Sequence, residues 1–301
     1  MTGASTTVER DALLDALEDV WQTIDRLFDE LGPADWGRAH GPDWTVADVP
    51  FHLSYFDREL VALPLERGAD VPDEVRAGLM RSTGDIDAWN AARFAERPAG
   101  LTVAGAREAA RASRVRVRDA ATHLDDAALD GPVFVPLAGM GWITARTALT
   151  AAIGHDWNHA AELRLRLGLG PDAPRPGAAA TQRALDFYTD LIARFARPAA
   201  AGSRPFTAVF VIEGPGGGAW SIRVAEGAAQ HKAGVAPDAD LVMSQDVDGF
   251  VRTLNGLHNP MVAILTGRIK VRGKRQLGRF GKVFAPPEPG EPIAPRGEAP
   301  W

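Results

Sequence analysis

The chain has 301 residues, more than one compact core usually contains, so two domains are expected. Apolar residues make up 46% and charged residues 24%, as in ordinary globular proteins, and the net charge of −6 argues against nucleic-acid binding, which needs a basic face. The absence of cysteine excludes disulfides, a cysteine nucleophile and any Cys-ligated metal.

The sequence offers no sign of a membrane or a secretory route. No stretch of membrane-spanning length is free of charges, and residues 1–10 lack a basic segment followed by an apolar one. We therefore expect a cytoplasmic protein, a monomer or small homo-oligomer, with no membrane partner. The one basic run, residues 268–275, is interpreted as the solvated face of a strand.

The first helix is predicted from Thr6 to about residue 31. Thr6 and Glu9 have the spacing of a capping box, and Gly32-Pro33 ends the pattern. The residues that recur at helical spacing are Leu13, Leu17, Val20, Trp21, Ile24, Leu27, Phe28 and Leu31.

A second helix is predicted to begin near residues 44–48, where Thr45 and Asp48 again have capping-box spacing. Its apolar stripe consists of Val49, Leu53, Phe56 and Leu60. Further helices are expected over residues 85–97, 104–124 and 144–167, and residues 131–140 are expected to form a loop or a hairpin. These helices predict an N-terminal all-α, up-and-down four-helix bundle over residues 1–170.

The composition changes after the bundle. Residues 171–180 are rich in Pro, Gly and Ala and predict a linker. A helix at 181–195 is followed by strands with two-residue alternation, as at Trp220, Ile222 and Val224, and by short helices. The sequence thus predicts a small α+β domain over residues 181–285, with a disordered Pro/Gly/Glu-rich tail at 286–301.

Two histidines lie four residues apart in the last bundle helix. His155 and His159 therefore project from one helix face, one turn apart, and neutral imidazole is a good ligand for Zn²⁺. Ala148, Ala151 and Ala152 continue this face towards the N-terminus, and Glu162 and Arg166 towards the C-terminus. Small and polar residues suit a cavity wall, but a solvent-exposed face is an equal alternative from this helix alone.

His52 favours the cavity. Its neighbours at i−3 and i+4, Val49 and Phe56, are apolar, so it points into the bundle. A lone histidine on an apolar face is usually a hydrogen-bonded core residue, but facing helices of bundles also build metal sites. We predict that His52, His155 and His159 bind a divalent metal with one position left open, as in catalytic zinc sites. His40, His123, His231 and His258 are interpreted as structural or surface residues.

Two segments carry a resemblance to a known family. Residues 44–53 (WTVADVPFHL) and 154–162 (GHDWNHAAE) resemble the metal-binding segments of the maleylpyruvate isomerase family of mycothiol-dependent enzymes, whose N-terminal half is a DinB-like bundle. Residues 87–90 (DAWN) resemble its third-helix segment. Residues 240–243, 248–250 and 265–273 resemble a sterol-carrier-protein-like domain. Some maleylpyruvate isomerases use a glutamate as one metal ligand, whereas this chain has the two histidines of the wider superfamily.

The resemblance implies mycothiol as cosubstrate. A metal with an open position lowers the pKa of a bound thiol, and the thiolate then adds to a double bond, which permits isomerisation, or is transferred to the substrate. The absence of cysteine agrees with a borrowed nucleophile. Zn²⁺ is the first choice, although three histidines also accept Ni²⁺, Co²⁺ or Fe²⁺.

Candidate substrate-orienting residues are Arg81, as a catalytic residue, and Asn90 and Arg223, as substrate-binding residues. For each, a solvated surface role is the simpler alternative. Two other functions remain open. One is a non-enzymatic carrier of small ligands with a structural metal site. The other is a thiol-independent metal hydrolase, for which Asp57 or Asp156 would be the base.

Overall fold

The computed structural model describes residues 6–41 and 44–293. The described residues form two compact units: residues 6–21, 28–41, 44–156 and 287–293 make the first, and residues 22–27 and 157–286 the second. The helices α1 (Thr6–Glu30) and α8 (Ala145–Leu167) contribute residues to both. The predicted boundaries at residues 170, 180 and 285 stay predictions.

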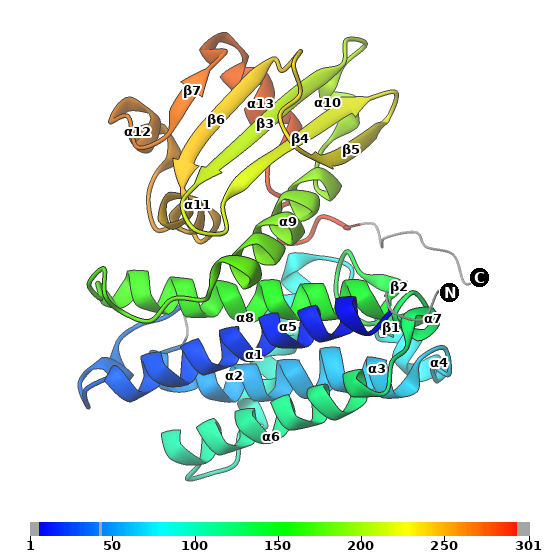
Figure 1. The fold of residues 1–301 in the computed structure, drawn as a ribbon, viewed down its shortest axis with the longest axis vertical. Helices are drawn as coiled ribbons and strands as arrows, with labels where there is room; N and C mark the ends of the chain where they lie inside the picture. Colours follow the sequence, from blue (N-terminus) through cyan, green and yellow to red (C-terminus); the bar gives the residue numbers. More distant parts are fainter. Residues whose placement is uncertain (1–5, 42–43, 294–301) are drawn as a thin grey trace. The chain divides into compact units, whose positions relative to one another are not determined.

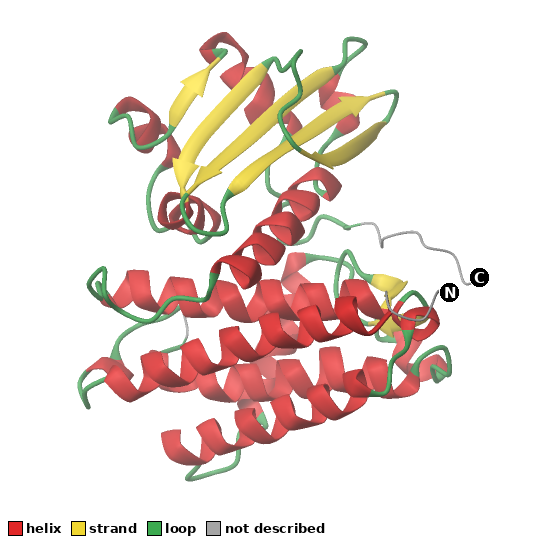
Figure 2. Cartoon of the chain, in the orientation of Figure 1, coloured by secondary structure: helices red, strands yellow, loops and turns green. Residues whose placement is uncertain are grey.

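The first unit is almost entirely helical (Figure 1, Figure 2). Short 3₁₀ turns, Asp35–Gly37 and Val46–Asp48, precede the second long helix. The helices are α1 Thr6–Glu30, α2 Val49–Phe56, α3 Leu63–Arg67, α4 Asp73–Ala77, α5 Thr83–Ala95, α6 Val103–Thr122, α7 Asp126–Leu129 and α8 Ala145–Leu167.

The predicted apolar stripe of α1 is buried from Leu13 to Phe28. Leu13, Leu17 and Leu27 are fully buried, and the helix ends two residues before Gly32-Pro33 stops the pattern. The side chain of Thr6 lies outside the described part of the chain, so its capping box is not tested. The second predicted box is present, because the Asp48 carboxylate accepts from the Thr45 backbone N–H at 2.8 Å.

The second helix is longer than the apolar pattern indicates. After α2 the backbone continues through a π-helical segment, Asp57–Ala62, directly into α3. Pro64, which has no backbone N–H to donate within this continuous helix, follows the π-helical segment by two residues. Such π segments are frequent at functional sites, and this one begins one turn after His52.

A short hairpin joins α7 to α8. Strands β1 (Pro132–Val135) and β2 (Gly141–Thr144) pair antiparallel, with Phe134 opposite Trp142. The expectation of a loop or hairpin over residues 131–140 is therefore met by β1 and its turn.

The second unit contains a five-stranded sheet of order β5-β4-β3-β6-β7. Only β3 and β6 run parallel; the other neighbours are antiparallel. The strands are β3 Phe206–Glu213, β4 Gly218–Ala225, β5 Ala228–Ala233, β6 Leu241–Asp246 and β7 Lys270–Arg272, and the helices are α9 Ala178–Arg194, α10 Pro198–Ala201, α11 Val247–Leu254, α12 Pro260–Leu265 and α13 Leu277–Val283. A 3₁₀ turn, Lys274–Gln276, precedes α13.

The alternation predicted for the strands places one face of the sheet in the core. Phe206, Ala208 and Phe210 of β3 and Ile222 and Val224 of β4 belong to a single buried cluster. This α+β region and the helical region before it confirm the two-part architecture.

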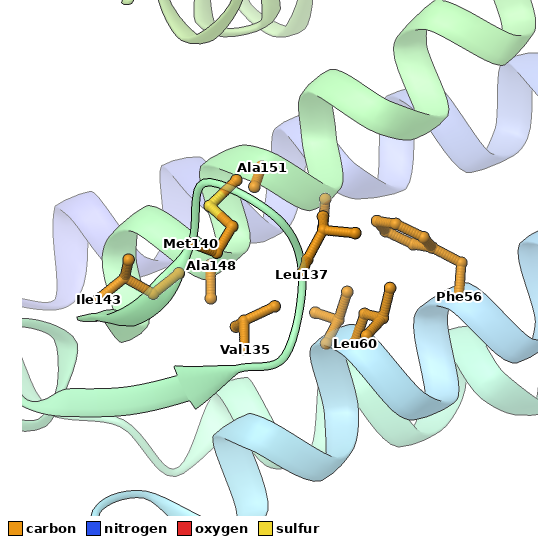
Figure 3. Close-up of a pocket in the computed structure, with 10 residues that line it drawn as sticks. Phe56, Leu60, Val135, Leu137, Met140, Ile143, Ala148 and Ala151 are labelled. Atoms are coloured by element: carbon orange, nitrogen blue, oxygen red, sulfur yellow. The ribbon is translucent and has the colours of Figure 1, made fainter. Parts of the chain in front are cut away.

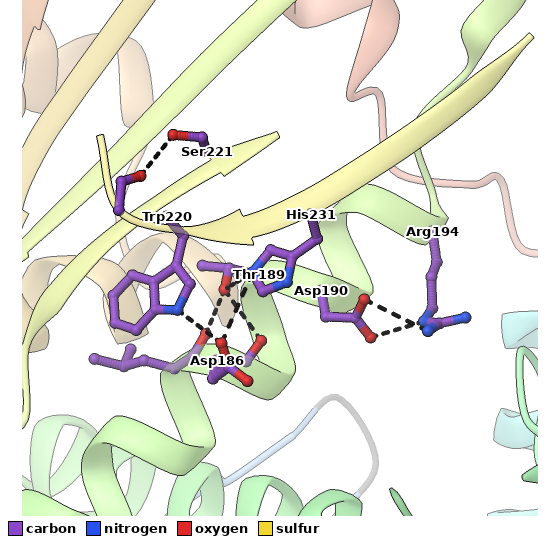
Figure 4. A network of polar contacts seen from close by, with 9 residues as sticks. Asp186, Thr189, Asp190, Arg194, Trp220, Ser221 and His231 are labelled. Carbon is purple, nitrogen blue, oxygen red and sulfur yellow. Dashed lines mark hydrogen bonds and ion pairs between the residues drawn. The ribbon is translucent and has the colours of Figure 1, made fainter. Parts of the chain in front are cut away.

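Polar contacts tie α9 to strands β4 and β5 (Figure 4). The Trp220 indole N–H donates to Asp186 at 2.8 Å, and the Thr189 hydroxyl lies 2.9 Å from His231 Nε2. Thr189 is fully buried and also donates to the Leu185 carbonyl. We therefore assign this network a structural role, which is to hold α9 against the sheet.

Residues 287–293 of the predicted tail belong to the first unit and are hydrogen-bonded to other residues of it. The Gly84 N–H donates to the Pro289 carbonyl, and the Ile293 N–H donates to the Arg81 carbonyl. Residues 294–301 lie outside the described residues. Among the described helices, none is both long and apolar enough to cross a membrane.

Candidate metal centre

Helix α2 presents His52 on its buried face. Only 5% of the residue is exposed, and Leu53, Tyr55 and Phe56 around it are buried as well. The capping box at Thr45 and Asp48 fixes where this helix begins and therefore which face His52 occupies.

A tyrosine and an asparagine orient the His52 ring. Its Nδ1 atom lies 2.7 Å from the Tyr55 hydroxyl oxygen, and that hydroxyl donates to Asn90 Oδ1 at 3.0 Å. Because the hydroxyl proton is used on Asn90, the Tyr55 oxygen accepts from His52. This assigns the proton of His52 to Nδ1 and leaves the lone pair on Nε2.

An aspartate orients His155 in the same way. Its Nδ1 lies 2.8 Å from Asp156 Oδ1, and the other oxygen of Asp156 accepts from the Trp21 indole N–H at 2.8 Å. Asp156 is fully buried, and the His155 ring stacks on Phe56 with a centroid separation of 3.4 Å. The carboxylate assigns the His155 proton to Nδ1 as well, so its Nε2 also carries a lone pair.

The two Nε2 atoms face each other at 3.0 Å. Without a proton or a cation between them, two lone pairs at this distance repel. Burial, the nearby His155 and the nearby His40 hold the pKa of His52 well below its ordinary value, which disfavours the proton. Two Zn–N bonds of about 2.0–2.1 Å at a tetrahedral angle place the nitrogens roughly 3.3 Å apart, close to the observed spacing.

His159 follows His155 by one turn on α8 and completes the group. One ring nitrogen from each of His52, His155 and His159 lies within 4.8 Å of the others, and His159 is buried. The arrangement could hold one divalent metal through three imidazoles. Each ring is neutral in the form that binds a metal.

A second group includes a histidine that sequence reasoning assigned to structure or surface. His40, His159 and Glu162 also have ligand atoms within 4.8 Å of one another, and His40 is only 1% exposed. A bridge between Ala39 and Thr45 folds the His40 loop back on itself, and the His40 ring contacts Trp44 edge-on. Only the short distance in sequence between His40 and the helix that carries His52 could have indicated that His40 lies near the other histidines.

Part of the small-residue face of α8 lines an apolar pocket of only about 10 Å³ (Figure 3). Ala148 and Ala151 contribute to a narrow apolar pocket whose other walls include Leu60, Val135 and Phe56. Because the Phe56 ring also stacks on His155, this pocket adjoins the histidine group through an aromatic wall.

The two carboxylates considered as bases are both buried. Both oxygens of Asp156 are used, by His155 and Trp21, which leaves little room for a water. Asp57 is fully buried, and neither of its oxygens has a hydrogen-bond partner among the described residues; Arg114 lies 4.0 Å away. Burial and the charge of Asp156 raise the pKa of Asp57 well above its ordinary value, against the effect of Arg114.

The remaining candidates lie in three different settings. Asn90, on α5, reaches the centre indirectly through Tyr55. Arg81 precedes α5 and is exposed, and its backbone N–H donates to Asp85 at 2.7 Å. Arg223, on β4 of the second unit, forms an ion pair of 3.5 Å with Asp238.

The fold and this centre define a class: a helical unit whose buried histidines could hold a metal, joined in one chain to an α+β sheet unit. Residues 16–163 match the DinB superfamily, and residues 191–280 match the SCP-2 sterol transfer family. The order of these two matches, a DinB superfamily region followed by an SCP-2 sterol transfer family region, agrees with the resemblance found in the motifs.

Among solved structures, the chain is similar to the mycothiol-dependent maleylpyruvate isomerase, at 16% identity over 81% of this chain and 87% of that chain, with a TM-score of 0.49. A histidine-to-alanine mutant of that isomerase gives 16% identity, the same coverage and a TM-score of 0.48. The sec-alkylsulfatase Pisa1 from Pseudomonas sp. gives 19% identity over 48% of this chain and 25% of that chain, with a TM-score of 0.31. No curated protein matches the chain.

Proposed function

We propose that the protein is a divalent-metal-dependent enzyme that activates a low-molecular-weight thiol, with His52, His155 and His159 as the metal ligands. The observation that carries the proposal is the pair of Nε2 atoms 3.0 Å apart, with the Nδ1 of each ring bonded to Tyr55 or Asp156. Such outer partners fix both the tautomer and the orientation of metal-bound histidines. Zn²⁺ is the first choice among the divalent ions that accept this ligand set.

A metal bound here would act as a Lewis acid that lowers the pKa of a coordinated thiol. The chain supplies the rest of the site. Tyr55 and Asp156 hold the ring protons away from the centre, and Phe56 covers one face of His155. The nucleophile must come from a cosubstrate, because the chain has no cysteine.

Mycothiol is proposed as that thiol on the strength of the two motif segments, residues 44–53 and 154–162. Isomerisation and S-transfer share the thiol-activation step, so both reactions fit the same centre. Arg81, Asn90 and Arg223 remain the proposed substrate-orienting residues. The up-and-down four-helix connectivity and a cytoplasmic location are part of the same proposal.

The decisive experiment is a turnover assay of metal-replete protein with activated carboxylates and S-conjugates, with and without mycothiol. We expect turnover that requires both the metal and the thiol and that is lost in His159→Ala. His123→Ala is the matched control, since this histidine is exposed near the end of α6. Turnover without the thiol would indicate a metal hydrolase instead, and a protein without bound metal that keeps its fold and activity in His159→Ala would refute the proposal.

A further inference from the structure

A pocket with a cationic wall lies in the second unit, lined by α8, the linker, α9 and α11. Its volume of about 360 Å³ falls within the range of small-molecule sites, about 300–1,000 Å³. The α8 residues that line it are Trp157, Ala160, Ala161 and Arg164, a stripe with helical spacing. Trp157 follows His155 by two residues, about 200° around the helix, so this stripe faces away from the histidines.

A buried arginine forms part of the pocket wall. The Arg164 side chain is only 5% exposed and donates to the Asp248 carboxylate through Nη2. Among the described residues, Asp248 is its one side-chain partner, although a guanidinium carries five N–H donors. Burial lowers the pKa of Arg164 from its ordinary value, which reflects how much solvation this cation has lost. The remaining donors are available to a ligand.

Positive charge exceeds negative charge at this wall. Arg175, on the linker, places Nη1 at 3.3 Å from both oxygens of the same Asp248, so two guanidinium groups share one carboxylate. Arg252, one turn beyond Asp248 on α11, adds a further positive charge that acts on Arg164. The first residue of α9, Ala178, also lines the pocket, and its N-cap Gly177 contributes no side chain. The helix N-terminus adds to the field that favours an anion.

The rest of the wall is apolar and stiff. Pro174, Pro176 and Pro215 line the pocket, and proline rings restrict the backbone that carries them. The Trp157 side chain is almost fully buried and its indole N–H donates to Thr181 Oγ1 at 3.1 Å, so Trp157 contributes no donor to the pocket. A ligand matched to this wall has an apolar body and one anionic group.

We propose that this pocket binds a small organic carboxylate, with its carboxylate on Arg164 and Arg175 and its apolar body against the linker prolines. This site is separate from the proposed metal centre, and a planar carboxylate matches the paired donors of a guanidinium group.

The test is isothermal titration of the full-length protein with benzoate, and with benzamide as the neutral isostere. We expect benzoate to bind in the millimolar range or tighter and benzamide at least about tenfold more weakly, since charge-assisted hydrogen bonds are the strong ones. Arg175→Gln should weaken benzoate binding about tenfold, because Arg175 is exposed on the linker and its loss leaves the core intact. Arg194→Gln, at the far end of α9, is the matched control and should leave binding unchanged.

Three results would overturn the proposal: equal binding of benzoate and benzamide, no binding of benzoate in the millimolar range, or unchanged benzoate affinity in a folded Arg175→Gln. Inorganic phosphate provides a further arm. Displacement of benzoate by phosphate at comparable concentration would show a general anion site rather than a carboxylate site and would also overturn it.

Discussion

The Nε2 atoms of His52 and His155 lie 3.0 Å apart, while the Nδ1 atom of each ring is bonded to a different outer partner. Tyr55 and Asn90 fix the first ring, and Asp156 and Trp21 fix the second. The protein thus directs two lone pairs at one point in a buried environment, which is unfavourable until a cation lies between them.

Metal binding should therefore stabilise the fold. At a free Zn²⁺ concentration 100 times its Kd, we expect the free energy of unfolding to rise by about 2.7 kcal/mol relative to the chelated protein. Urea unfolding with Zn²⁺ and with chelator measures this difference. His155→Ala should abolish the gain, and the exposed His123→Ala should preserve it. An equal gain in His155→Ala would place the stabilising metal elsewhere.

Asp156→Asn should weaken metal binding without removing a ligand. The amide no longer offers a charged acceptor to His155 Nδ1, and loss of such an outer partner typically costs 10–100-fold in metal affinity. Competition with a chromogenic chelator measures the change. Trp21→Phe removes only the donor on the other Asp156 oxygen and should cost less. An affinity in Asp156→Asn equal to that of the wild type would mean that the carboxylate does not orient His155.

Asp57 should make the stability of the protein fall as pH rises. Its pKa is raised above the ordinary value of 3.8 by burial and by Asp156, so the folded chain keeps a proton that the unfolded chain releases. Below pH 3.8 both states are protonated and Asp57 adds no pH dependence. Between 3.8 and the raised folded value, stability falls with pH by up to about 1.4 kcal/mol per pH unit.

The Asp57→Asn variant lacks this titrating group. The free energy of unfolding of Asp57→Asn minus that of the wild type should therefore grow as pH rises from about 4. Urea unfolding in chelator at a series of pH values measures the difference and avoids metal effects at the histidines. A difference that stays constant over the series would show that Asp57 is ionised in the folded state, paired with Arg114.

The elements that sequence predicted best are those whose signal is local. The α1 stripe, the Thr45–Asp48 box and the His155/His159 spacing each depend on residues within a single helix or turn, and each is present. Strand β5, with the sequence AAQHKA, was not anticipated, because it lacks apolar alternation and is defined by pairing with β4. Because β5 lies at the edge of the sheet, it tolerates polar residues at positions where a central strand would need apolar ones.

The direct partners of the histidines, Tyr55 and Asp156, are close to them in sequence, but the residues behind those partners come from distant segments and could not be predicted. Asn90 reaches His52 only through Tyr55, and Trp21 reaches His155 only through Asp156. His40 enters a group with His159 only because the Ala39–Thr45 bridge turns its loop inward. Spacing within one helix identifies which histidines share a face, whereas tertiary packing decides what orients them.

Gly216→Ala should destabilise the second unit, which tests the turn between β3 and β4. Gly216 has φ +74°, and a Cβ there would lie 2.4 Å from the Ala178 carbonyl oxygen and 2.7 Å from Thr181 Cβ. Both obstacles are fixed, since one is backbone at the start of α9 and the other is a Cβ, so the turn must move. We expect a loss of roughly 1–3 kcal/mol from backbone strain alone.

The Gly170→Ala variant is the control, because Gly170 has φ outside the left-handed region and a Cβ added there would meet nothing within 4 Å. Urea unfolding monitored by circular dichroism compares the two, and equal stability would mean that α9 does not approach the turn this closely in solution.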